Sequence, residues 1–146
     1  MAGDSVASRV GPILIVSMIA LAGAGCDSVL DDTQELPDFA RVVLTGTSPV
    51  DLEIVTSTNY QVVSDFELQE TFIQLILSDT VLAVPPYEDD IDIRSSERFF
   101  VRVTNHALEV ADVTLEVSFD GRVEYSQAAF MSEGGSLEFS QTFSGT

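Results

Sequence analysis

The chain has one cysteine and one histidine. The catalytic, metal-binding or modification role of each can therefore be considered separately. Cys26 ends an apolar stretch, and acidic residues follow it at once, beginning with Asp27. A structural cysteine more often lies inside an alternating strand, where its small apolar side chain is easily buried. Packing therefore does not explain the position of Cys26, and we take it as the first candidate site.

The residues before Cys26 resemble the signal peptide of bacterial lipoproteins. Residues 13–22 (ILIVSMIALA) form an uninterrupted apolar block, which is shorter than the roughly 20 residues of a spanning helix. The small residues Ala24 and Gly25 lead into Cys26 as in a lipobox, although Gly23 stands where that motif usually has leucine. The resemblance implies cleavage just before Cys26 and acyl chains on its sulfur and new amino group.

This interpretation divides the chain into three parts. They are a signal peptide and its helix over residues 1–25, an acidic tether over 26–38 and a folded domain over 39–146. Each buried CH₂ of an acyl chain contributes about 0.8 kcal/mol, so two or three chains hold a protein firmly at a membrane. We therefore expect a lipoprotein anchored in the bacterial cell envelope, facing the periplasm or the exterior.

Two other interpretations of the leader stay open. Ala22-Gly23-Ala24 fits an A-x-A site for ordinary secretory cleavage, which would release a soluble protein. An uncut leader would instead remain as a membrane helix.

The excess of acidic residues limits the kinds of molecule that the protein can bind. The sequence has 24 acidic residues against six arginines and no lysine, which gives a formal net charge of −18. Such a surface repels DNA, RNA and anionic lipid headgroups, so nucleic-acid binding is not expected. Hydrophobic residues make up 45% of the chain, which is far more than a disordered segment carries.

Catalytic chemistry has few residues to work with. His106 lies in the polar segment NHALEVAD, whereas a catalytic base is normally fixed by packed neighbours. One histidine and one acylated cysteine cannot complete a four-ligand zinc site. We expect the protein not to be an enzyme.

The densest acidic cluster is the segment Glu88–Asp92. Calcium is bound by six to eight oxygen atoms from carboxylates and carbonyls, which makes Asp89, Asp90 and Asp92 candidate calcium ligands. The alternative is a solvated acidic loop. Apart from calcium, no cofactor is expected.

A second candidate site lies on one strand face. Arg98, Phe100 and Arg102 share the outward side of the segment RFFVRVTN. Arginine and aromatic residues are favoured at protein interfaces, so an exposed Phe100 between two guanidinium groups predicts a partner patch. The alternative is that these arginines form cross-strand ion pairs with outward acids such as Asp112 and Glu116.

Strands must position these residues, because apolar side chains recur at every second position from Phe39 onward. The clearest strand covers residues 111–119. We expect residues 70–84 to form two strands joined at 78–80, the first of them central in its sheet. The dipeptide Asp120-Gly121 predicts a hairpin, and matching apolar faces favours a three-residue loop over 120–122, pairing Phe119 with Val123 and Val117 with Tyr125.

Seven to nine short strands with turns about every ten residues predict a single antiparallel β-sandwich of the immunoglobulin-like or fibronectin-like kind. The antibody hallmarks, a tryptophan and a cysteine pair, are absent, and a jelly roll is the alternative. We expect a lipid-anchored, non-enzymatic binding or structural module, whose partner is an envelope protein or polysaccharide. The alternative is a carbohydrate- or calcium-binding module, although Tyr60, Tyr87 and Tyr125 do not obviously share a face.

Overall fold

The alternating pattern becomes strand structure throughout the part of the chain that the computed structural model describes, residues 36–67 and 69–143. The predicted leader, Cys26 and most of the tether lie outside this part. Within it, no helix has the length and hydropathy needed to cross a membrane. The strands are β1 (Phe39–Thr47), β2 (Leu52–Asp65), β3 (Glu70–Ala83), β4 (Tyr87–Asp92), β5 (Arg98–Thr104), β6 (Ala111–Phe119), β7 (Arg122–Met131) and β8 (Ser136–Thr142).

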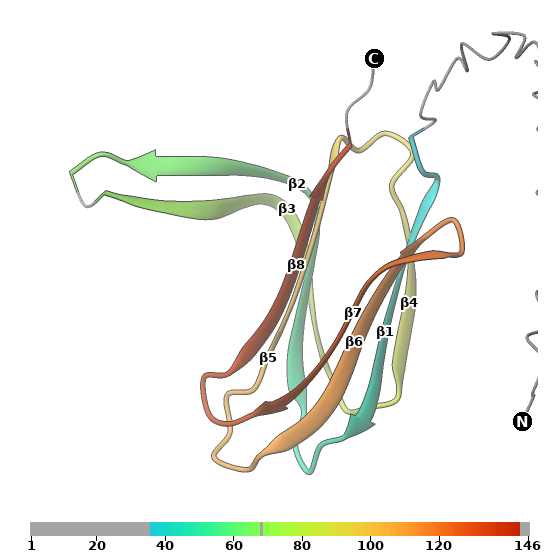
Figure 1. Cartoon of the computed structure of the whole chain (residues 1–146), viewed down its shortest axis with the longest axis vertical. Helices are drawn as coiled ribbons and strands as arrows, with labels where there is room; N and C mark the ends of the chain where they lie inside the picture. The colour runs from blue at the N-terminus through green and yellow to red at the C-terminus, as the bar shows by residue number, and fades with distance from the viewer. Residues whose placement is uncertain (1–35, 68, 144–146) are drawn as a thin grey trace, which may run out of the picture. The chain divides into compact units, whose positions relative to one another are not determined.

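These strands form two antiparallel four-stranded sheets, ordered β4-β1-β6-β7 and β3-β2-β5-β8 (Figure 1). The predicted all-β architecture of two antiparallel sheets is confirmed. Counted from the first described strand, β1 and β2 lie in different sheets, whereas the first two strands of an immunoglobulin domain share one sheet. The immunoglobulin-like class therefore stays a prediction.

The core consists of the inward-facing side chains of both sheets. In β6 the predicted inward residues are all buried, from Ala111 at one end to Phe119 at the other. They pack against inward residues of β5 across the sandwich. The rings of Phe99 and Phe119 contact each other edge to face, with their centroids 5.7 Å apart. This core holds the two sheets together.

Residues 70–83 form one continuous strand, so the prediction of two strands joined at 78–80 was wrong. The three polar residues stay in the ladder, where Ser78 pairs with Ser57 and Thr80 pairs with Val55 of β2. The segment contains neither glycine nor proline, the residues that most readily turn a chain. The expected central position was also wrong, because β3 is an edge strand.

The β6–β7 hairpin turns over two residues rather than the predicted three. Asp120 and Gly121 both have positive φ, +47° and +83°, as a two-residue hairpin turn of this kind requires. Phe119 consequently pairs with Arg122. A bulge between Val117 and Ser118 then restores the predicted pairing of Val117 with Tyr125, which brings the apolar faces back together.

The far part of the β2–β3 hairpin extends beyond the sandwich (Figure 1). We call this part, residues 58–67 and 69–77, the arm. Its ladder is irregular at Ser57, Asn59 and Tyr60, and such a bulge bends and twists a strand locally. The bend lies where β2 leaves the sheet, so it directs the arm away from the core.

Candidate functional site

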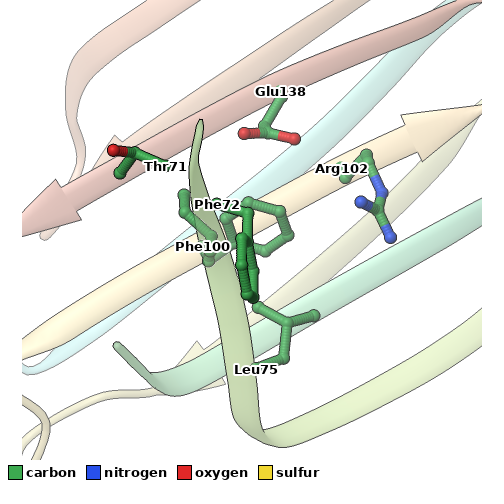
Figure 2. Close-up of a pocket in the computed structure, with 7 residues that line it drawn as sticks. Thr71, Phe72, Leu75, Phe100, Arg102 and Glu138 are labelled. Atoms are coloured by element: carbon green, nitrogen blue, oxygen red, sulfur yellow. The ribbon is translucent and has the colours of Figure 1, made fainter. Parts of the chain in front are cut away.

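The arm and the outer face of its sheet enclose a groove with a volume of about 460 Å³. One wall comes from β3 of the arm and the other from the outward side chains of β5 and β8. Figure 2 shows Phe72 and Leu75 beside Phe100, with Arg102 and Glu138 at the same groove. The lining residues are Thr71, Phe72, Ile73, Leu75, Phe100, Arg102 and Glu138.

Phe100 forms the floor where the arm joins the sheet. It points outward from β5, between Ser57 of β2 and Ser140 of β8 in the ladder. Tyr60 covers it with a ring centroid 6.2 Å away, and only 1% of Phe100 is exposed. The prediction of an exposed phenylalanine was therefore wrong, because a hairpin distant in sequence covers the outer face of this strand.

The two arginines flanking Phe100 are held without carboxylate partners among the described residues. Arg98 donates a hydrogen bond of 2.6 Å from Nη1 to the backbone oxygen of Tyr60, and its guanidinium lies over the Tyr60 ring at 5.4 Å. The Arg102 guanidinium lies over the Phe100 ring at 5.8 Å. Neither forms one of the ion pairs found in the described residues.

The expected ion pairs of these arginines with Asp112 and Glu116 do not form. Both acids lie on β6, which belongs to the other sheet. The neighbours of β5 are β2 and β8, which place Val55 and Glu138 opposite Arg102 in the ladder. The alternation of residues predicted the outward face correctly, but it could not predict which strand would be the neighbour.

The arm presents apolar side chains to solvent. Phe66 near its tip is 91% exposed, and half or more of the surface is exposed at Val62, Phe72, Ile76 and Leu77. A two-stranded hairpin is at best marginally stable in water unless something packs against it. The exposed side chains of the arm are therefore available to a partner.

Sequence reasoning missed the arm altogether. A signal was present in the segment Phe72–Leu77, where apolar residues occupy both faces of a strand in an otherwise alternating protein. Both apolar faces suggested a buried central strand. In the structure this strand leaves the sheet. Its Ile73 and Leu75 are half-buried at the groove, whereas Phe72, Ile76 and Leu77 are exposed.

The acidic segment forms strand β4, not a loop, and this separates the candidate calcium ligands. Asp90 and Asp92 pair with Arg41 and Phe39 of β1 in the ladder, whereas Asp89 pairs with Val42 and so points to the opposite face. Oδ1 of Asp90 lies 3.9 Å from Nη1 of Arg41, and Asp92 forms an ion pair with Arg94. Within the described residues no group of three potential ligands forms a metal cluster. Calcium binding stays a prediction that this geometry does not favour.

His106 lies in the connection after β5. Its Nε2 atom is 3.3 Å from Oε1 of Glu53, and its side chain is 63% exposed. It lines neither the groove nor a second cavity of about 310 Å³ between the arm base and residues 95–98. The three tyrosines lie on three different strands, β2, β4 and β7, and Tyr60 is buried.

Comparisons with protein-family models, with curated proteins and with solved structures give no match to this chain. What the protein does must therefore be inferred from its own residues and their arrangement.

Proposed function

We propose that this protein is a lipid-anchored, non-enzymatic binding module of the bacterial cell envelope, which contacts another protein through its arm and groove. The observation that carries the proposal is the exposed apolar surface of the arm. Contiguous exposed apolar residues on a soluble domain mark interaction sites. In a chain of net charge −18, five exposed large apolar residues gather on this one hairpin: Val62, Phe66, Phe72, Ile76 and Leu77.

A protein partner is favoured over a polysaccharide. The chain has no tryptophan, and Tyr60, Tyr87 and Tyr125 lie on separate strands, so they offer no aromatic platform for sugar rings. The groove instead combines apolar walls with one arginine and one glutamate. Aromatic residues and arginine are typical of the centre of a protein interface.

A binding role is also favoured over catalysis. A general base needs a positioned partner and a site that holds a substrate. His106 is largely exposed and lies outside both cavities described above. Its Nε2 atom lies 3.3 Å from Oε1 of Glu53, which is an ordinary contact between side chains at a surface.

The anchor part of the proposal rests on the lipobox resemblance around Cys26. Intact mass spectrometry of the mature protein tests it: we expect a chain that begins at Cys26 and carries the added mass of acyl chains. Cys26→Ala should block cleavage and lipid attachment. An unmodified mature chain that begins at Gly25 would contradict lipid anchoring and leave a secreted domain.

The arm part can be tested with a photo-crosslinking amino acid placed at Phe66 in the native envelope. Phe130 serves as the matched control, because it is also a highly exposed phenylalanine, at 79% against 91% for Phe66, but lies on β7 of the other sheet. We expect a discrete crosslinked protein from position 66 and little from position 130. Equal crosslinking at the two positions, or none at position 66, would contradict the role of the arm.

A further inference from the structure

We propose that the partner of the arm is a second copy of this chain, and that the two copies pair along the free edges of their β3 strands. The inference rests on the proposed function in taking the arm as the interaction surface. β3 is an edge strand, so the side of its backbone that faces away from β2 has no strand partner in the described structure. An unpaired strand edge is a template for pairing with another chain.

The edges of the protein differ in how they are protected. β4 carries four acids in six residues, and such charges keep an edge strand from pairing. β3 is 14 residues long, contains neither lysine, arginine nor proline, and has acids only at Glu70 and Asp79. Between these two acids the edge is open and largely apolar.

The sequence of this edge is complementary to itself. In Phe72-Ile73-Gln74-Leu75-Ile76, two large apolar residues stand on each side of one glutamine. A twofold axis beside Gln74 would place Gln74 opposite Gln74 of the second copy. Ile73 would then face Leu75 and Phe72 would face Ile76, so that apolar side chains meet on both faces of the new ladder. A twofold interface requires such self-complementarity.

The charges agree with the same register. Glu70 would face Ser78 and Asp79 would face Gln69, so no acid opposes an acid along the edge.

The pairing also accounts for the exposed arm. Two arms joined in this way would form a four-stranded sheet in place of two isolated hairpins, and three or more strands are what a small sheet needs for stability. In a chain that otherwise repels its own copies, residues 71–78 of β3 give an edge segment without a charged side chain.

Disulfide trapping tests the register, using the full chain in detergent with Cys26→Ala to remove the native thiol. Gln74→Cys would place two thiols directly opposite each other, at a Cα separation of about 4.5–5.5 Å, which is within the range of a disulfide. Gln61→Cys is the matched control. Gln61 hydrogen-bonds Gln74 across the same arm at 3.2 Å, but in the dimer the two Gln61 positions would be three strand spacings, about 14 Å, apart. Under mild oxidation we expect covalent dimer from Gln74→Cys and little from Gln61→Cys.

Sedimentation of the anchored chain tests the dimer itself. We expect about twice the monomer mass for the native protein and a return to monomer mass for Ile76→Lys, which places a charge opposite Phe72 of the second copy. Phe130→Lys, an equivalent change at an exposed site of the other sheet, should leave the dimer intact. Circular dichroism shows whether each variant is folded.

Three results would overturn the inference: monomer mass at every concentration, equal disulfide yield from positions 61 and 74, or growth beyond a dimer. If the chain is monomeric while position 66 crosslinks a different protein, this inference fails and the proposed function stands. If position 66 crosslinks nothing, the role of the arm fails with it.

Discussion

The buried side chain of Asn105 donates a hydrogen bond of 2.9 Å to the backbone oxygen of Met131 and so links the two sheets. Asn105 follows β5 of one sheet, and Met131 ends β7 of the other. The side-chain Nδ2 of Asn105 also donates to the backbone oxygen of Glu109 at 2.7 Å. Its Oδ1 accepts a hydrogen bond of 2.9 Å from the backbone N–H of Ala107. One side chain therefore satisfies three backbone groups at this end of the sandwich.

Asn105→Ala should destabilise the fold strongly. The backbone oxygen of Met131 is buried, and a buried group left without a partner costs about 1–3 kcal/mol. The groups of Ala107 and Glu109 are only part-buried, so water replaces part of what they lose. Chemical denaturation measures the free energy of unfolding, with Asn59→Ala as an exposed asparagine for comparison. Similar losses for the two variants would show that the link is not important for stability.

Gly46 and Gly121 should respond differently to alanine. Both have positive φ, +109° and +83°, but a Cβ on Gly46 would lie 2.2 Å from the backbone oxygen of Asp112, whereas nothing lies within 4 Å of a Cβ on Gly121. Gly121→Ala should cost only the left-handed conformation, about 1–2 kcal/mol. Gly46→Ala adds overpacking of about 1–3 kcal/mol, so its melting temperature should fall further. A larger fall for Gly121→Ala would contradict this assignment of the clash.

Arg94 lowers the pKa of Asp92 below its ordinary value of 3.8, chiefly through side-chain hydrogen bonds and then through its backbone amide. The native state therefore favours the charged carboxylate. The resulting stabilisation is present above pH 3.8 and is lost as the pH falls through the lowered native pKa.

Carboxyl titration by NMR checks this interaction. Arg94→Ala should raise the pKa of Asp92 toward 3.8, although the backbone hydrogen bond from residue 94 remains. Arg122→Ala, which removes the ion pair with Glu124 on β7, should leave the pKa of Asp92 unchanged. An Asp92 titration that does not respond to Arg94→Ala would show that the guanidinium is not the cause.

Added salt should stabilise the protein. The part after Cys26 contains 23 acids and five arginines, which gives 5 − 23 = −18, and such self-repulsion opposes a compact state. The Debye length falls from about 30 Å at 0.01 M to about 10 Å at 0.1 M salt, so NaCl should raise the melting temperature over this range. A flat or falling melting temperature would contradict the charge argument.

The same titration distinguishes screening from calcium binding. CaCl₂ at matched ionic strength should raise the melting temperature about as much as NaCl does, because β4 places Asp89 on the face opposite Asp90 and Asp92. An excess effect of calcium that disappears when Asp90→Asn is combined with Asp92→Asn would instead support a calcium site.

The sequence by itself determined which face of β6 is apolar. In β6, the alternation from Ala111 to Phe119 predicts the inward side chains, and all of them are buried. This works because a strand sends successive side chains to opposite faces whatever lies beside it. The position of the turn at Asp120-Gly121 is equally local, since it depends on backbone conformations that those two residues tolerate, although the predicted loop length was wrong.

Only the tertiary structure decided which strands are neighbours, and this decided the candidate site. Phe100 is buried because Tyr60, 40 positions earlier, covers it. Arg102 lies opposite Glu138 rather than an acid of β6 because β5 pairs with β8. The apolar residues of β3 look like those of a central strand, yet the strand lies at an edge and extends into the arm. Alternation specifies the two faces of a strand but not what covers either face, since that depends on contacts between distant parts of the chain.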